Sequence, residues 1–213
     1  MEYTTDKIAK DVRTALDMNR VSTALEGIGD IDTLTLNDII KSKIPEATRG
    51  VHNLAPVQML DSAKDFKTAK LEWGVKESGV VKLPDDFMRL VKFRMSDWAR
   101  PVYSVGTPED SDYWMRKSPY KGLRGTPERP RCVLVPTESG YELEYYSCKD
   151  REATIEEALY MPWAEEKNGA IDVCEKCYQA MVYEAAALTY VTIGENEKGT
   201  VLEALAKKEL GIQ

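Results

Sequence analysis

The CxxC spacing of Cys174 and Cys177 is the first pattern in the chain whose residue types could do chemistry. Such a pair can bind zinc when two more ligands are near, or exchange thiols when its first cysteine follows a strand and begins a helix. Here both cysteines fall inside an apolar pattern of helical spacing, and Cys132 and Cys148 fall in separate predicted strands. We therefore favour a buried structural role and expect free thiols.

Other chemistry-bearing residues do not form a recognisable catalytic set. His52 is the only histidine, so any Ser-His-Asp or Cys-His arrangement would depend on it alone. The sequence has no GxSxG motif, phosphate-binding loop or GxGxxG motif. Neighbouring carboxylates on a strand or helix point in different directions, so these pairs do not converge: Asp85 with Asp86, Glu156 with Glu157, and Glu165 with Glu166. The sequence predicts neither an enzyme nor a cofactor.

Residues 104–130 form a long predicted loop in which cations and aromatic side chains are mixed. Such a mixture can contact nucleic acid by stacking and charge, or another protein through Tyr, Trp and Arg anchors. We favour a protein partner, because the chain has a net charge of -7 and tight nucleic-acid binding needs clustered cations. The residues predicted to face a partner are Tyr113, Trp114, Arg116, Tyr120 and Arg124.

The N-terminal part of the chain is predicted to be helical. Residues 1–67 predict two or three helices. The first runs from residue 5 to about 20 and is followed by a turn at 26–30. The next begins at a capping pattern on Thr35, and Pro45 is expected to kink or restart it.

The middle of the chain, residues 68–160, changes to short runs rich in Val, Tyr and Trp, divided by Gly, Pro and Asp. This predicts an antiparallel β-rich domain that carries the long loop. From Val91 to Met95 apolar and basic residues alternate, so one face of this strand should be buried. The other face, with Lys92 and Arg94, should be wet.

The C-terminal part returns to helical spacing. Residues 161–194 predict a helix, clearest from 170 to 193, that packs on the N-terminal helices. The tail at 195–213 predicts a short amphipathic helix with no place in the same core. Its apolar residues are Val201, Leu202, Leu205 and Leu210. The predicted fold class is α+β, a helical bundle formed by N- and C-terminal helices with an inserted antiparallel β-rich domain.

Composition and charge fit one large or two small globular domains. The chain has 213 residues, of which 43% are hydrophobic and 31% charged. No secretory signal or membrane-spanning run is recognised, so we expect a protein assembled in a cytoplasm. Residues 81–131 carry 11 Lys and Arg against 7 Asp and Glu, whereas residues 138–213 carry 7 against 16. A mildly basic middle thus precedes an acidic end.

The stretch KLPDDFMRLVKFRMSDW, residues 82–98, resembles the LPxDFLRL stretch of head-to-tail connector (adaptor) proteins of short-tailed phages, the tail-tubular-protein-A-like group. Further short segments resemble the same family in the same order: SDYWMRKSPY, GTPERPRCVLVP, GYELEYYSCKD, YMPWAEE and AMVYEAAALTYVTIGENEKG. The similarity covers roughly residues 75–195, although GYELEYYSCKD lacks the family's usual prolines. GDIDTLTLNDIIKSKI, together with the composition, resembles ring proteins of crAss-like phages.

The resemblance implies a ring of twelve copies below the portal of a virion, around the DNA exit channel. It implies that one turn redirects the chain from the helical body into the β-domain, and that turn is Leu83, Pro84, Asp85, Asp86 and Phe87. The face with Lys92 and Arg94 would meet solvent or an acidic neighbour. The tail at 195–213 would dock on the portal, and the long loop would face a neighbouring subunit or the tail.

Three functional hypotheses follow. The first is a structural virion protein, a homo-oligomeric connector ring that binds the portal and the downstream tail proteins and has DNA only as passing cargo. The second is a cytoplasmic CxxC protein that binds zinc or exchanges thiols, which one zinc per chain or an acidic thiol would favour. The third is a phage assembly factor with nucleic-acid affinity, which steeply salt-dependent DNA binding would favour.

Overall fold

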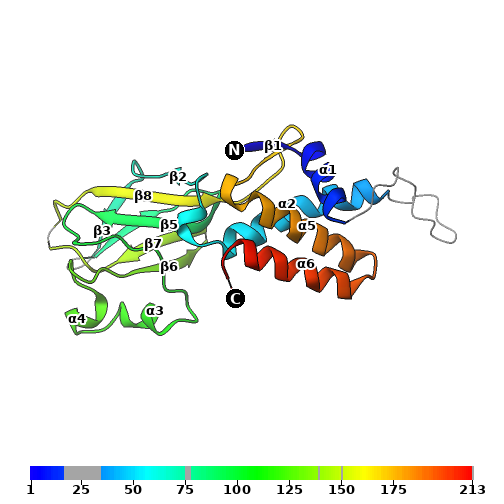
Figure 1. Ribbon diagram of the computed structural model, residues 1–213. Helices are drawn as coiled ribbons and strands as arrows, with labels where there is room; N and C mark the ends of the chain where they lie inside the picture. Colours follow the sequence, from blue (N-terminus) through cyan, green and yellow to red (C-terminus); the bar gives the residue numbers. More distant parts are fainter. Residues whose placement is uncertain (17–34, 75–77, 139, 150, 213) are drawn as a thin grey trace. The chain divides into compact units, whose positions relative to one another are not determined.

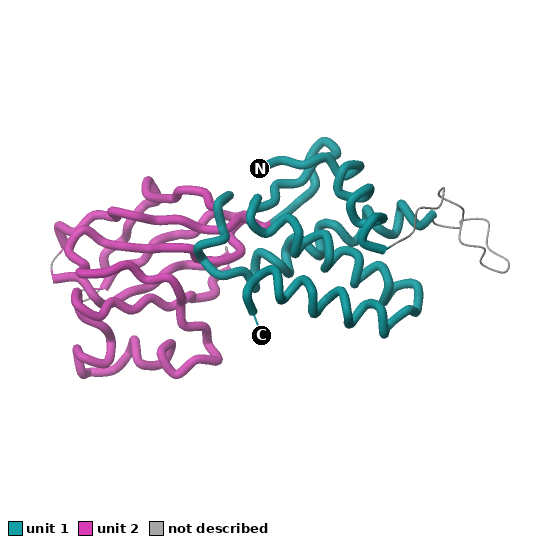
Figure 2. Tube along the Cα trace, viewed as in Figure 1, with its two compact units in different colours: residues 1–62, 164–213 teal, residues 63–163 magenta. Residues whose placement is uncertain are grey.

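A computed structural model of the chain describes residues 1–16, 35–74, 78–138, 140–149 and 151–212. The chain divides into two compact units, which Figure 2 shows in different colours. The helical unit contains residues 1–62 and 164–213, and the β unit contains residues 63–163. The described residues form helices and three antiparallel sheets, so the predicted α+β class is confirmed. No helix in the described ranges is long and apolar enough to cross a membrane.

The helical unit is built from both ends of the chain (Figure 1). Its elements are β1 (Glu2–Thr4), α1 (Thr5–Ala15), α2 (Leu36–Leu54), the 3₁₀ turn η1 (Val57–Met59), β9 (Ala170–Asp172), the 3₁₀ turn η2 (Glu175–Cys177), α5 (Tyr178–Thr192) and α6 (Asn196–Glu209). β1 pairs with β9 antiparallel. The two helices expected near the N-terminus begin at side-chain caps from Thr4 and Thr35.

Helix α5 is the centre of this unit, because it packs against α1, α2 and α6. Its buried residues surround the helix rather than form one stripe, and they include Met181, Ala185 and Ala186. Small residues let α6 approach closely. A Cβ atom added at Gly199 of α6 would lie 3.2 Å from the carbonyl oxygen of Ala187, so a larger residue there would push the two helices apart.

Three helix predictions need comment. Pro45 does not restart α2, which runs unbroken past it, with buried residues before and after the proline that include Ile44 and Ala47. The first helix ends at Ala15 with Leu16 as its C-cap. Its expected continuation to residue 20, and the turn at 26–30, lie outside the described residues.

The helix expected from residue 170 begins only at Tyr178, so that prediction was wrong over its first eight residues. The reason is a long-range one. Residues 170–172 form β9 on β1, and the N-terminal amine of Met1 binds Asp172 at 2.7 Å and the carbonyl oxygen of Val173 at 2.9 Å. The spacing of apolar residues within one segment carries no information about hydrogen bonds to the opposite end of the chain, so it could not predict this strand.

The β unit contains two sheets, in the orders β2-β8-β5 and β3-β4-β7-β6. The elements are β2 (Lys64–Asp65), β3 (Leu71–Trp73), β4 (Gly79–Lys82), β5 (Phe87–Met95), α3 (Ser111–Met115), α4 (Lys121–Arg124), β6 (Cys132–Thr137), β7 (Gly140–Tyr145) and β8 (Ile155–Pro162). The expected alternation in β5 is confirmed, since Val91, Phe93 and Met95 are buried and Lys92 and Arg94 are only partly covered.

Side chains from both sheets share one core, with Phe93 of β5 at its centre. Its ring centroid lies 6.1 Å from that of Phe66, 5.6 Å from that of Trp98 and 5.9 Å from that of Tyr145. Phe93 is fully buried. Because aromatic rings bury large areas and prefer such edge and offset contacts, this cluster is the main apolar link between the two sheets.

We predict that Phe93→Ala lowers the free energy of unfolding of the β unit by about 3 to 5 kcal/mol, because it removes a fully buried ring and leaves a cavity. Urea unfolding followed by tryptophan fluorescence measures this change. Tyr141→Ala is the matched control, since this β7 ring is 49% exposed and its loss should change stability by less than about 0.5 kcal/mol. Equal effects of the two substitutions would contradict the assignment of Phe93 to the core.

Candidate functional site

The Leu-Pro-Asp-Asp turn lies inside the β unit. It connects β4 of the four-stranded sheet to β5 of the three-stranded sheet, and the N–H of Phe87 closes it by donating to the carbonyl oxygen of Pro84 at 3.0 Å. The expectation that this turn leads the chain from the helical body into the β-domain is therefore wrong. The β unit begins at Ala63, and three strands precede the turn. Leu83 is buried beneath it.

Of the two turn aspartates, Asp86 makes the contacts and Asp85 is exposed. One Asp86 carboxylate oxygen accepts from Lys64 Nζ at 2.8 Å and the other from the hydroxyl of Tyr160 at 2.7 Å. Partial burial raises the pKa of Asp86, but these two hydrogen bonds outweigh it and leave the pKa below its usual value. Phe87 stacks on Tyr160 with ring centroids 5.9 Å apart. These contacts give the turn a structural role, in which it connects the two sheets of the β unit.

The basic face of β5 is neutralised within the chain. Lys92 forms an ion pair with Glu157 of β8. The guanidinium of Arg94 lies with its Nε 3.4 Å from a carboxylate oxygen of Glu156 and its Nη1 3.6 Å from one of Glu157. The lysine pair also lowers the pKa of Glu157. The two side chains keep part of their surface in solvent, at 26% and 30% exposed, but cross-strand carboxylates already occupy their charges and leave little for an acidic neighbouring subunit.

The 104–130 segment contains two short helices, and two of its cations, Arg116 and Arg124, are partly buried. Arg116, which follows α3, lies with its Nε 3.0 Å from a carboxylate oxygen of Glu144 on β7. Its guanidinium stacks 3.8 Å from the ring centroid of Tyr113, which is itself buried. The Arg116 and Glu144 side chains are only 10% and 18% exposed. This pair therefore fixes α3 onto the sheet rather than facing a partner.

Tyr146 extends the same cluster. Its hydroxyl donates to Glu144 at 2.5 Å, and the guanidinium of Arg124, the last residue of α4, lies 5.9 Å from its ring centroid. Burial first, and the bond to the Glu144 carboxylate second, raise the pKa of Tyr146 to about 12. Sequence reasoning named Arg116 and Arg124 but missed Glu144 and Tyr146, because no local pattern links them to the loop. Arg116 and Arg124 are thus engaged within the β unit, which leaves Lys117, Lys121 and Arg129 as the exposed cations of the segment.

Three apolar side chains of the same segment point outward instead. Trp114 is 63% exposed, Tyr120 71% and Leu123 44%. We call these three residues the loop patch. The indole N–H of Trp114 donates to the carbonyl oxygen of Pro108 at 3.2 Å, so its ring is held in place although it is exposed. Exposed, oriented aromatic side chains of this kind are typical of protein interfaces.

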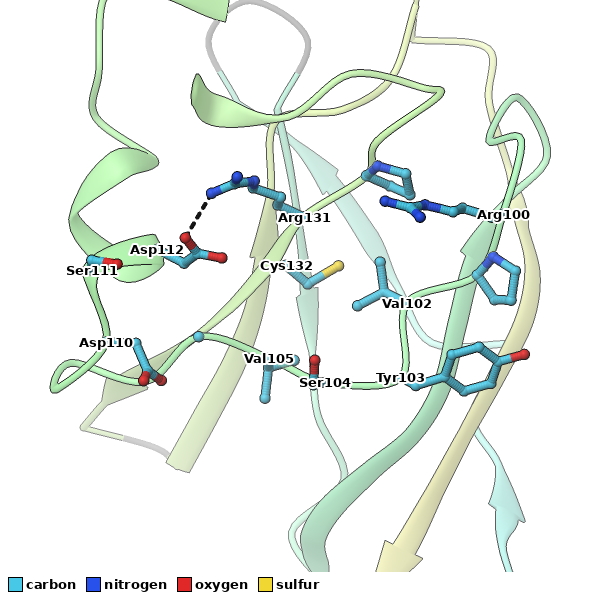
Figure 3. Close-up of a pocket in the computed structure, with 13 residues that line it drawn as sticks. Arg100, Val102, Tyr103, Ser104, Val105, Asp110, Ser111, Asp112, Arg131 and Cys132 are labelled. Carbon is cyan, nitrogen blue, oxygen red and sulfur yellow. Dashed lines mark hydrogen bonds and ion pairs between the residues drawn. The ribbon is translucent and has the colours of Figure 1, made fainter. Parts of the chain in front are cut away.

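A pocket of about 760 Å³ lies between residues 100–106, the start of α3 and the start of β6 (Figure 3). Figure 3 shows Arg131 turned toward Asp112, and the two side chains form an ion pair at 2.6 Å. Arg100 lines the pocket from the opposite side. Because one of the two arginines is already paired with a carboxylate, the pocket does not present two free guanidinium groups that could clamp an anion.

The C-terminal tail is folded onto α5, so the expectation that it has no place in the core is wrong. Leu202 and Leu210 of this segment are 8% and 3% exposed. Val201 at 62% and Leu205 at 37% remain open to a partner. Of the four residues expected to form a docking arm, two thus hold the helix in place and two form its outer face.

The CxxC cysteines lie before α5 rather than inside it, which corrects their expected position. Cys174 follows β9 and Cys177 is the N-cap residue of α5. His52 of α2, distant in sequence, receives a hydrogen bond on its Nε2 from the N–H of Cys174 at 3.1 Å. Among the described residues no group of three or more His, Cys, Asp or Glu side chains is arranged to hold a metal ion.

No protein-family model matches this chain, and a search of curated proteins finds no match either. The surfaces described above are therefore interpreted from their own geometry. Two exposed apolar faces stand out, the loop patch on the β unit and the outer face of α6. Both can bind protein, and neither brings together groups that would transfer a proton or attack a substrate.

We predict that Arg116→Met destabilises the β unit by about 3 kcal/mol, because it leaves the largely covered Glu144 carboxylate without its cation. Chemical unfolding at neutral pH measures the change. The exposed neighbour Lys117 supplies the control, and Lys117→Met should shift stability by no more than about 0.5 kcal/mol. If Arg116→Met were as stable as Lys117→Met, the inward role of Arg116 would be refuted.

Proposed function

We propose that this protein is a structural virion protein, a connector ring that joins the portal to the tail and surrounds the DNA exit channel. The observation that carries the proposal is the ordered series of motifs over residues 75–195 that resembles the connector family. The proposed architecture is a bundle of N- and C-terminal helices with the β unit inserted between them. The grouping of residues 1–62 with 164–213 in one compact unit supports this arrangement.

A closed ring needs two different, complementary surfaces on each copy. Lys92 and Arg94 cannot supply the basic one, since β8 carboxylates pair with them. We propose instead that the loop patch packs against the neighbouring copy. Its exposed Trp114 and Tyr120 are the residue types that anchor interfaces, and the Arg116–Glu144 pair beneath them holds α3 rigidly.

The outer face of α6 is the proposed portal contact. Val201 and Leu205 are four residues apart, so they lie on the same side of the helix. Leu202 and Leu210 of the same segment are buried and anchor it in the core. A helix whose inner face is already packed presents a preformed apolar stripe, which lowers the ordering cost of docking.

A net charge of -7 is compatible with DNA as passing cargo. A ring that DNA must traverse should not hold the phosphates, and tight binding requires unpaired, clustered cations. In the β unit the cations Lys92, Arg94, Arg116 and Arg131 are each in an ion pair with a carboxylate.

The test is negative-stain imaging of the full chain mixed with the portal ring of the same phage. The proposal expects an added layer of density with the rotational symmetry of the portal. A portal that gains no density in the presence of excess protein would reject the connector role. Steeply salt-dependent DNA binding in the same preparation would instead favour an assembly factor with nucleic-acid affinity.

We predict that Val201→Asp combined with Leu205→Asp abolishes the added layer, because two charges would have to be buried against the portal. Both sites are solvent-accessible, so the helical content measured by circular dichroism should not change. Thr200→Asp, on the exposed polar side of the same helix, is the control and should still bind. Retained binding by the double variant would exclude α6 as the portal contact.

We predict a different outcome for Trp114→Ala combined with Tyr120→Ala. Single copies should still reach the portal through α6, but the layer should lose occupancy and order because neighbouring copies no longer contact each other. Class averages and the copy number per portal, measured by native mass spectrometry, would report this. Tyr141→Ala, an exposed ring on β7, is the control. A complete ordered layer formed by the double variant would remove the loop patch from the interface.

A further inference from the structure

The CxxC cysteines are held in a geometry that permits a bond between them. The N–H of Cys177 donates to the carbonyl oxygen of Cys174 at 2.9 Å, which closes one 3₁₀ turn. In such a turn the first and fourth Cα atoms are less than about 7 Å apart, and a disulfide needs about 4.4 to 6.8 Å. Both side chains are fully buried, so both turn toward the same interior.

The surroundings fix this turn from the side of residues 57–61. Asp61 accepts a hydrogen bond from the N–H of Glu175 at 3.0 Å, and Lys176 donates to the carbonyl oxygen of Gln58 at 3.1 Å. The thiol of Cys177 lies 3.6 Å from the carbonyl oxygen of Met59. These contacts hold the backbone of the turn in place whether or not a bond joins the two sulfur atoms.

The two thiols are also chemically unequal. A hydrogen bond from Cys177, and then the imidazole of His52, lower the pKa of Cys174 even though burial opposes them. The same bond and burial raise the pKa of Cys177. One sulfur therefore tends toward the thiolate, the nucleophilic form, and the other keeps its proton until it is needed.

The other two cysteines differ from this pair. Burial raises the pKa of both Cys132 and Cys148, and the Asp97 carboxylate adds to the rise at Cys148, which reaches about 12. Neither is part of a turn with a second cysteine. Both lie in the core of the β unit, outside any CxxC turn, and serve as internal controls within the same chain.

We propose that Cys174 and Cys177 are a redox-active pair that small hydroperoxides oxidise reversibly to an intrachain disulfide. The Cys174 thiolate attacks one oxygen of hydrogen peroxide, the O–O bond breaks, and a sulfenic acid forms while hydroxide leaves and takes up the proton that the Cys174 thiol had released, giving water. Cys177 then attacks the sulfenic sulfur, forms the S–S bond and releases a second water. The two sulfur atoms together lose two electrons, which the peroxide gains, and a dithiol reductant returns them.

Because both sulfur atoms are buried, only a small oxidant can reach them. Hydrogen peroxide is small enough to reach them through local fluctuations, whereas a protein disulfide is not. The bond would secure the junction of β9 and α5, to which the first strand of the chain is paired. This inference rests on the helical unit alone and does not depend on the connector role.

The experiment treats the reduced full chain with hydrogen peroxide under native conditions and then alkylates it in denaturant. We expect a product that is lighter by two hydrogen atoms before alkylation and takes up alkylating reagent only at Cys132 and Cys148. Trypsin cleaves after Lys176, so the bond should join two separate peptides. Dithiothreitol should restore four reactive thiols.

Variants order the two steps. Cys177→Ser should stop at a Cys174 sulfenic acid that dimedone captures, whereas Cys174→Ser should leave Cys177 unmodified at the same peroxide dose. If a variant fails to fold, the alkylation pattern of the wild-type protein after peroxide treatment still tests the proposal. Oxidation of all four cysteines to the same extent, a bond to Cys132 or Cys148, reaction only after unfolding, or one tightly bound zinc per chain would each overturn the proposal.

Discussion

The helical unit depends on hydrogen bonds between the first residues of the chain and residues 169–173. β1 pairs with β9, the Met1 amine binds Asp172, and the N–H of Thr5 donates to the carbonyl oxygen of Gly169 at 2.9 Å. These contacts hold α1 at the start of the chain beside α5 near its end. Without them α5 would lose one of the three helices packed around it, and its buried surface on that side would meet water.

The same contacts decide where α5 begins. Residues that continue β9 cannot also be helical, so the helix starts after the CxxC turn and the cysteines stand at its start. This position gives them hydrogen-bond partners from α2 and from residues 57–61 that a mid-helix position would not provide. The chemistry of the pair is thus a consequence of strand pairing, not of the CxxC spacing itself.

Local patterns were enough to predict the fold class, the caps at the start of the second helix, and the buried face of β5. They were insufficient wherever a partner distant in sequence decides the outcome. From the sequence Lys92 is predicted to be a solvent-exposed cation, but in the structure it pairs with Glu157 of β8. Arg116 is likewise predicted to anchor an interface, but it pairs with Glu144 of β7. A single sequence contains both members of each pair but not the register that joins them.

This internal neutralisation also changes which surfaces remain for binding. A mildly basic middle region and an acidic C-terminal region suggested an interface between opposite charges. In the β unit, however, several of the cations form ion pairs with carboxylates of neighbouring strands or helices. Among the exposed side chains are apolar ones suited to binding, namely Trp114, Tyr120 and Leu123 on one unit and Val201 and Leu205 on the other. Such contacts are weakly screened by salt, so an assembly built on them should tolerate the ionic strength that dissolves charge-paired interfaces.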